Sequence, residues 1–366
     1  MRTDIKVILY LLFLPILFNT VSSFGQEPIP VQKPEYYLLE WPHNKELFEK
    51  ETGISFEVDS VGTHEVRLIV DTRDRPKAYT SDIATPVCAD GECRLMHLKL
   101  FWTLLGNYAG FSTYPGLPLT KHDHDPFQKE DYAKLHALLM DRRSILERRT
   151  IDELVEKPKK RKVNGIDALS GATIAEVKES VVPGALYSCY VAWHLANGHL
   201  RDSIRAHSKK LSDSEMLADM LHSNTMDYHI YAVSRFNATQ YNTHHKRIAE
   251  IFRTGSPLLR GIIIKNQPNS FWSSQKRQRP FWDAFLGIDL NSKSLLLEHL
   301  DKAPIPVLED ISSYLGTMSK NQLKVYLEHL AHLSHIPSKI QDNLKETVKS
   351  DNHTYTYLIE EFLEGF

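Results

Sequence analysis

From about residue 200 to the C-terminus, the sequence is a run of short amphipathic segments, and this run restricts the possible folds more than any other feature. Apolar residues recur in each segment at intervals of three and four, which predicts one helix per segment. The connections are short, as between antiparallel helices packed side by side. We therefore expect an all-α domain over 205–366. A HEAT-like array would fit, although the spacing is too irregular to define a repeat. The expected helices are 212–221, 228–236, 245–252, 258–265, 292–300, 306–315, 321–333, 338–349 and 355–363.

The preceding part has a different pattern, in which apolar and polar residues alternate. Alternation at 65–71 and 94–102 predicts two half-buried strands, because successive side chains of a strand point to opposite faces. These strands belong to an expected α+β domain over 41–198. The side chains expected on one face are Val66, Leu68 and Val70, followed by Met96, Leu98, Leu100 and Trp102.

Two helices are expected in the same domain. The first covers 44–52, since Gly53 stands where a glycine commonly ends a helix. The second runs from Asp125 to about residue 148. Asp125 would be its N-cap, Pro126 would occupy the first helical position, and Gln128 would complete a capping box.

The first 26 residues have the pattern of an export signal. Arg2 and Lys6 precede an apolar run over 7–18, and small polar residues follow. The run is shorter than the roughly 20 residues that a membrane-spanning helix needs. We therefore expect a signal peptide over 1–26, an extended arm over 27–40, and a soluble protein in the periplasm or another extracytoplasmic compartment. An uncleaved membrane anchor is the alternative.

Composition and cysteine usage narrow the function. The formal net charge of -2 argues against a general nucleic-acid binder, which needs an excess of Lys and Arg. Cys88 and Cys93 flank the turn signal Asp90-Gly91 and could form a structural disulfide, a redox-active dithiol or two free thiols. Cys189 would then be unpaired and buried.

Residues 167–173 read Asp-Ala-Leu-Ser-Gly-Ala-Thr and fit the pattern D-x-x-[ST]-G-A-[ST]. The segment resembles the covalent FMN-attachment motif of the FMN-binding domain family, whose members occur in sodium-translocating quinone reductases and related electron-transport complexes. In that family an exported flavin transferase joins FMN, through its phosphate, to the last Thr or Ser of the motif. The resemblance implies FMN linked to Thr173 by a phosphoester. It covers roughly residues 62–198 and is weak outside the heptapeptide.

The residue types suit this chemistry. A hydroxyl at the start of a helix, expected here from Ile174, would place the phosphate among unpaired backbone N–H groups. Gly171 and Ala172 would leave the backbone accessible to the transferase and the flavin. Ser170 could hydrogen-bond the phosphate or the local turn, and Asp167 could hold the turn or be read by the transferase.

Thr173 also has readings that need no covalent flavin. Thr173 and Glu176 are spaced as a capping box, in which the hydroxyl would cap the following helix. Glu176 would also lie near an esterified phosphate, and the two like charges would repel. Noncovalent flavin binding is a third reading.

Residues 121–125, Lys-His-Asp-His-Asp, are further candidates. Lys121 and His122 could contact the flavin or its phosphate, because a nearby cation stabilises the anionic forms produced on reduction. The segment could instead be a polar loop. We predict no metal site here, since a third well-spaced His is missing.

Tyr187, Tyr190 and Trp193 form an aromatic stripe at helical spacing, for which a place in the core is expected and stacking on the flavin is the alternative. Motifs for nucleotide phosphates, a serine nucleophile or covalent haem are absent from the sequence. We therefore expect an electron carrier matured by a flavin transferase and serving redox partner proteins, some of which could be membrane-bound. The alternatives are a flavin-dependent reductase of a small molecule and a flavin-free helical-repeat binding protein.

Overall fold

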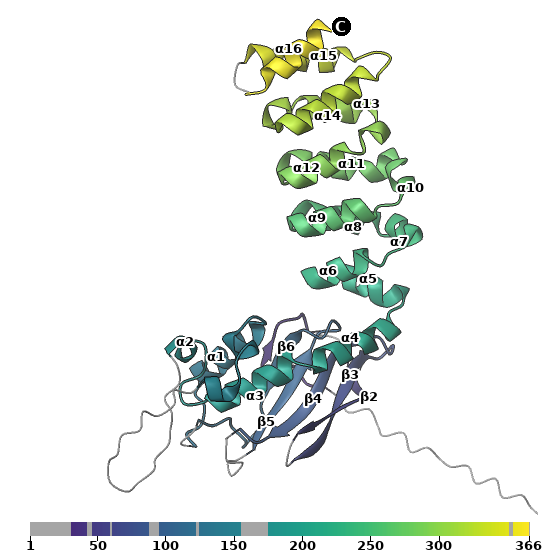
Figure 1. Cartoon of the computed structure of the whole chain (residues 1–366). Coiled ribbons are helices and arrows are strands. Elements are labelled where there is room, and N and C mark those ends of the chain that lie inside the picture. The colour runs from purple at the N-terminus through teal and green to yellow at the C-terminus, as the bar shows by residue number, and fades with distance from the viewer. Residues whose placement is uncertain are drawn as a thin grey trace, which may run out of the picture.

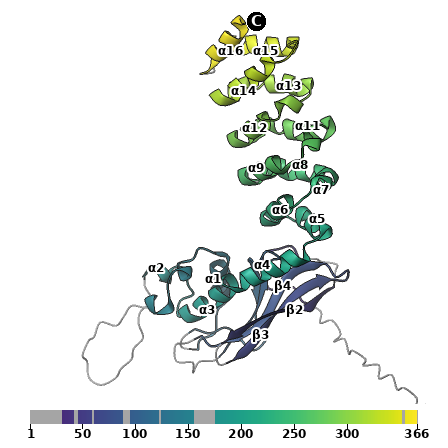
Figure 2. The same cartoon turned by 45° about the vertical axis from the view of Figure 1, so that its right-hand side comes forward.

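The computed structural model describes residues 31–41, 46–58, 61–87, 95–121, 124–154, 175–350 and 354–365. One antiparallel sheet, covered by helices, forms the N-terminal part, and a column of stacked helices rises from it (Figure 1). Figure 2, turned by 45°, shows the same two parts, with α4 lying along the sheet at the foot of the column. The predicted order of an α+β part followed by an all-α part is confirmed.

The sheet has six strands in the order β1-β6-β5-β4-β3-β2, and every neighbouring pair is antiparallel. From β2 onward each strand lies beside the next strand of the sequence, as in a meander. The short β1 adds to the far edge by pairing with β6. The strands are β1 (Tyr36–Tyr37), β2 (Leu47–Val58), β3 (Gly62–Asp71), β4 (Pro76–Thr85), β5 (Met96–Trp102) and β6 (Tyr108–Ser112).

The two predicted strands are confirmed as β3 and β5. Their alternating apolar side chains are buried on the face that packs against helices. Trp102 is fully buried, and its indole N–H donates to the carbonyl of Ala196 at 2.8 Å, which joins the sheet to α3. The side chains predicted to share this face, all of them in its core, are Val66, Leu68, Val70, Met96, Leu98, Leu100 and Trp102.

The predicted helix at 44–52 is wrong, because the chain from Leu47 onward forms β2. Gly53 does have positive φ, at 71°, but it lies in a β-bulge where the pairing with β3 shifts between Glu51 and Ile54. Left-handed backbone and a bulge both favour glycine. Gly53 therefore lies in a β-bulge and does not end a helix.

Helices α1 (Lys129–Met140), α3 (Leu186–Asn197) and α4 (Leu200–Leu211) cover one face of the sheet. The predicted second helix exists, but it begins later and ends earlier than expected. Gln128 is its N-cap, with Asp131 completing the capping box, so the assignment of Asp125 as N-cap is wrong. Pro126 instead forms a β-bridge with Thr120. Short elements follow α1: the 3₁₀ turns η1 (Ile145–Glu147) and η2 (Ile151–Glu153), then α2 (Ala175–Lys178).

The N-terminal arm covers part of the opposite face. Val31, Tyr37, Leu39 and Trp41 pack on a small apolar cluster formed by Leu47, Ile69, Ala78, Phe101 and Ala109. Gly110 permits the pairing of β1 with β6, because a Cβ there would lie 2.0 Å from the carbonyl oxygen of Tyr36. Within residues 31–40 the chain forms the short strand β1, with bends on both sides of it.

The column consists of helix pairs stacked in two layers. In one layer α5 packs on α8, α8 on α11, and α13 on α15; in the other, α6, α9, α12, α14 and α16 follow one another. Such stacking is that of an α-solenoid, in which each unit contacts its neighbours only. The helices are α5 (Ser214–His222), α6 (Met226–Val233), α7 (Ala238–Thr243), α8 (His245–Thr254), α9 (Pro257–Asn266), α10 (Asn269–Trp272), α11 (Gln275–Asp283), α12 (Leu290–Leu297), α13 (Ile305–Ser312), α14 (Lys320–Ala331), α15 (Ser338–Lys349) and α16 (Thr356–Glu364), with the 3₁₀ turns η3 (Phe285–Gly287), η4 (Leu300–Lys302) and η5 (Leu315–Thr317).

Each of the helices predicted for this part is present, whereas α7, α10 and α11 were not predicted. One short sequence, Leu-Glu-His-Leu, also occurs at equivalent places in two stacked helices. Leu297-Glu-His-Leu300 and Leu327-Glu-His-Leu330 lie at the ends of α12 and α14, and all four of these leucines are buried. Ser256, Asp289 and Ser319 cap α9, α12 and α14 in the same way, each accepting a backbone N–H three residues on.

The column and the sheet share a continuous apolar core, which runs from Val66 of β3 to Ile359 of α16. Helix α4 contains residue 205, where the helical domain was expected to begin, and packs on the sheet. The Tyr79 hydroxyl lies 2.9 Å from both His207 Nδ1 and Ser208 Oγ on α4. The backbone N–H of Leu104 donates to the Tyr228 hydroxyl of α6 at 2.9 Å. Buried polar contacts therefore fix the column at its foot.

Asp71 gives this region a pH dependence. Burial raises the pKa of its carboxyl. The backbone N–H bonds from Arg75 and Arg73, together with the charge of Lys77, lower this pKa by more than burial raises it, so the net shift is downward. A lowered folded-state pKa stabilises the protein above the unfolded value of about 3.9, and this contribution is lost as the pH falls through the folded value. We expect Asp71→Asn to lower the Tm at pH 7, with the difference from wild type shrinking as the pH falls below about 4. Thermal unfolding at a series of pH values measures this, and a constant difference would contradict it.

Candidate functional site

The heptapeptide motif lies outside the described residues, and the structure describes the chain on both sides of it. Before it, Leu154 is fully buried just after η2; after it, Val177 of α2 is equally buried. Both belong to the core beneath the helices of the sheet part. The segment that carries the motif is thus anchored at each end. The predicted site residues Asp167, Ser170, Gly171, Ala172, Thr173 and His122 lie outside the described residues, as do Cys88, Cys93 and the signal sequence.

The helix that follows the motif is short. Helix α2 spans one turn, Ala175–Lys178, and a turn with Gly184 at φ 74° leads into α3. A single turn has little macrodipole, because the dipole grows as peptide units align along an axis. A helix dipole would therefore contribute little to phosphate binding at this helix terminus. Unpaired backbone N–H groups are the larger contribution that such a terminus can offer a phosphate.

Lys121 lies in a closed loop that is tied to α1. Its backbone N–H donates to Asp125 at 2.8 Å, and its carbonyl accepts from His124, whose φ is 62°. Its ammonium group lies 2.8 Å from an oxygen of Asp131. Burial raises the pKa of that carboxyl, but the hydrogen bonds from Lys121 and the Gln128 N–H lower it more. The charge of Lys121 is therefore largely balanced by Asp131, a pairing that the sequence did not suggest.

The Lys121 loop touches the chain that comes after the motif. A Cβ built on Gly184 would lie 3.5 Å from the Cβ of Lys121, so the loop packs on the turn between α2 and α3. From α1, Lys134 donates to the carbonyl of Lys178 at 3.3 Å. Lys121 and α1 thus pack against the chain that follows the motif in the sequence, at Lys178 and Gly184.

A cavity of about 310 Å³ opens beside this loop. It lies between the start of β5, the segment 116–120 and α3, and Thr120 links it to Lys121. The volume is at the lower end of the range for small-molecule pockets. Most of its wall is apolar, and His97, Thr120 and Ser188 supply polar groups. The apolar lining residues are Val87, Leu95, Met96, Leu117, Pro118 and Leu119.

The aromatic stripe belongs mainly to the core, as expected. Trp193 is buried, and its indole N–H donates to the carbonyl of Asp141 at 2.8 Å. Tyr190 is half-buried and packs on the ring of His194 at 4.3 Å between centroids. Tyr187 is also half-buried.

Cys189 is buried and free, as the sequence predicted. Its burial raises the pKa of the thiol to about 12. Since the thiolate is the reactive form, we expect iodoacetamide to leave Cys189 unmodified in the folded protein and to modify it after unfolding. Peptide mapping by mass spectrometry distinguishes it from Cys88 and Cys93, and modification of Cys189 in the folded state would contradict its burial.

No protein-family model, curated protein or solved structure matched the chain. None of the helices among the described residues is both long enough and apolar enough to cross a membrane. Over the same ranges, no group of three or more His, Cys, Asp or Glu side chains is arranged to hold a metal ion.

Proposed function

We propose that this protein is an exported flavoprotein that carries FMN on Thr173 and passes electrons between extracytoplasmic or membrane partners. The observation that carries the proposal is the heptapeptide 167–173, which fits the full attachment pattern in a chain that also begins with an export-like segment. The packing of the Lys121 loop on Gly184, in the described chain that follows the motif, and the cavity of about 310 Å³ beside that loop support it.

The residues around the cavity are chemically suited to a flavin. An isoalloxazine ring is flat and largely apolar, and the walls formed by Met96 and Leu117 offer matching surface. The hydroxyls of Thr120 and Ser188 can hydrogen-bond its polar edge. Lys121 brings an ammonium group, whose charge Asp131 largely balances. FMN would supply one- or two-electron transfer, while these side chains position the ring and limit its exposure to water.

The solenoid supports a partner-binding role. Stacked helix pairs present an extended surface, which proteins of this architecture commonly use to hold other proteins. In the flavoprotein this surface would dock a redox partner. It also favours a second candidate function, a flavin-free interaction protein in which the sheet part only supports the column.

The deciding experiment is expression in an exporting host with and without a flavin transferase. We expect flavin fluorescence on a denaturing gel, and the mass of FMN on the peptide containing residue 173, only when the transferase is present. A colourless, unmodified protein under both conditions would reject the flavoprotein and leave the interaction protein.

A further inference from the structure

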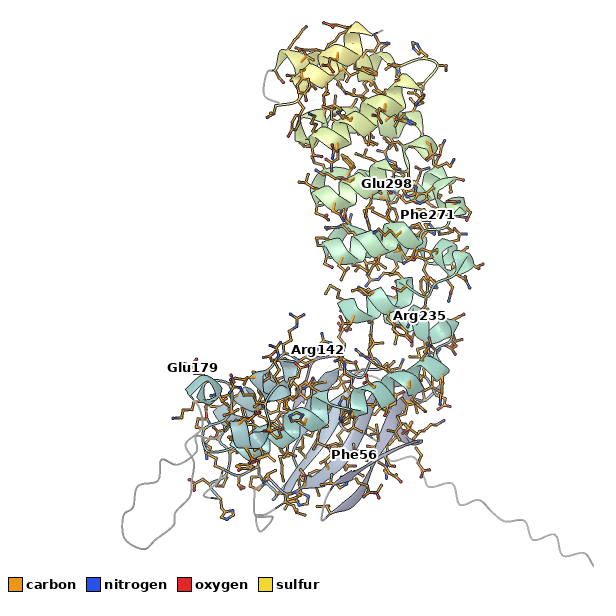
Figure 3. The ribbon with its side chains drawn as sticks, viewed as in Figure 1. Phe56, Arg142, Glu179, Arg235, Phe271 and Glu298 are labelled. Atoms are coloured by element: carbon orange, nitrogen blue, oxygen red, sulfur yellow. The ribbon has the colours of Figure 1, made fainter. Side chains whose placement is uncertain are left out.

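Three arginines from different elements surround a second cavity, at the junction of the sheet part and the column. Arg142 follows α1, Arg205 lies on α4 and Arg235 follows α6; together they line a cavity of about 300 Å³. In Figure 3, Arg142 is labelled on the sheet side of the junction and Arg235 on the column side. This place is separate from the cavity beside Lys121, since the two share no lining residue.

Each guanidinium is held in place but keeps free donors. Arg142 donates to the Asn107 side-chain oxygen at 3.0 Å, and Arg205 donates from Nε to the carbonyl of Leu105 at 2.8 Å. Arg235 lies over the ring of Tyr231, 3.6 Å from its centroid. A guanidinium has five N–H donors, so each retains several for a ligand. Neither Arg142 nor Arg235 forms an ion pair with a carboxylate of the described residues.

A fourth arginine lies behind them. Arg201 packs its backbone against Gly106, and its Nε is buried with no hydrogen-bond partner among the described residues. Burial lowers the pKa of this guanidinium, and the charges of Arg205 and Arg142 lower it further. Such mutual repulsion shows that the positive charges crowd together.

The acidic groups nearby do not balance this charge. Asp227 lines the same cavity, where it accepts from the Asn107 amide at 2.9 Å, and Asp202 lies 3.9 Å from Arg205 in a loose, exposed pair. Four guanidiniums thus face two carboxylates, in a chain whose formal net charge is -2. A local excess of positive charge in a hollow attracts anions.

We infer that this junction cavity binds a phosphate group. Arginine recognises the oxygens of phosphate and carboxylate through paired N–H donors. A carboxylate has two oxygens and is satisfied by one guanidinium, whereas a tetrahedral dianion can use donors from three directions, as Arg142, Arg205 and Arg235 provide. Ile230 and Tyr231 in the wall offer apolar contact for the organic part of a phosphate ester.

The test is isothermal titration of the full chain with inorganic phosphate at constant ionic strength. We expect binding in the millimolar range or tighter, similar binding of sulfate, and none of acetate. Arg142→Gln combined with Arg205→Gln should weaken phosphate binding at least about tenfold.

Arg279→Gln is the matched control, because this arginine on α11 is as exposed as Arg205 and is already paired with Asp283 and Asp310. Equal affinity in the double variant, or equal binding of acetate, would overturn the site.

Two further arms complete the design. Arg235→Gln leaves the contacts to Asn107 and Leu105 intact, so it should fold like wild type by circular dichroism and still weaken phosphate binding; unchanged binding would count against the site. Co-sedimentation with phosphatidylcholine vesicles that contain phosphatidic acid, whose headgroup is a phosphate monoester, distinguishes the source of the phosphate. Sedimentation that free phosphate prevents assigns a lipid headgroup, and phosphate binding without sedimentation assigns a soluble phosphate compound.

Discussion

Thr173→Ala should abolish the covalent flavin completely, because the methyl side chain has no oxygen to form the phosphoester. Flavin fluorescence on a denaturing gel and the mass of the peptide containing residue 173 measure the loss. Thr173→Ser keeps a hydroxyl and should retain the label. Ser170→Ala removes a neighbouring hydroxyl and should reduce labelling at most. Label that persists in Thr173→Ala would show that another residue is the acceptor.

A third variant separates flavin attachment from helix capping. Aspartate is a good N-cap but offers no hydroxyl, so Thr173→Asp should lose the flavin while keeping any cap that Thr173 provides. If Thr173 is a cap, Thr173→Ala would also cost about 1 kcal/mol of stability. If Thr173 is only a cap, the Asp variant should match wild type in Tm and neither protein should carry flavin.

Phe281→Ala should be the most damaging single change in the column. The Phe281 ring is fully buried and lies 4.6 Å from the ring of Phe252 and 5.2 Å from that of Phe271, which Figure 3 labels. Loss of a buried phenylalanine costs about 3–5 kcal/mol. In a solenoid each unit depends on its neighbours, so the helices beyond α11 should open while the sheet part stays folded. Hydrogen exchange measured by mass spectrometry should show early exchange from α11 to α16.

The matched control for this variant is Leu290→Ala in α12. Leu290 is 60% exposed, and exposed substitutions usually change stability by less than about 0.5 kcal/mol. Its exchange pattern should equal that of wild type. Uniform destabilisation of both parts by Phe281→Ala would mean that the column unfolds as one unit with the sheet.

The helices of the column were predictable because each buries one stripe of a regular period. Two of the missed elements have specific reasons. Helix α10 is a single turn, which is too short to show a helical period, and α11 contains Pro280, a residue that disfavours the interior of a helix. The thirty-residue recurrence of Leu-Glu-His-Leu was available in the sequence, but it covers only α12 and α14 and is diluted by irregular connections elsewhere.

The error at β2 has a different cause. This strand is at the sheet edge, and most of its side chains are half-buried or exposed. Its first half shows no alternation, whereas exposed and half-buried residues alternate from Glu51 to Val58. Its residues Leu47 to Glu51 are acceptable in a helix, and pairing with β3 decides the outcome. Strand formation depends on such distant partners more than on local preference. Local sequence therefore did not identify the first half of β2, whereas the alternation of Ile54, Phe56 and Val58 was a local signal for the second half.

The candidate site was predictable only where its residues are contiguous. The heptapeptide is visible as a pattern, and Lys121 was found from its charge. The cavity beside it combines Val87, Leu117 and Ser188, which are distant in sequence and meet only in the fold. The arginine cavity likewise combines Arg142 after α1 with Arg205 on α4 and Arg235 after α6. Residues that are distant in sequence and meet only in the fold leave no pattern in the local sequence.

The stacking of α9, α12 and α14, each capped in the same way, makes the column adjustable in length. Whole helix pairs could be gained or lost through gene duplication or deletion without altering the sheet, because the main contacts of each pair are with those before and after it. The foot of the column, fixed by Tyr79 and Tyr228, would stay unchanged. Proteins that evolve from this chain could thus differ in the length of the column while they keep the sheet part and α4 unchanged.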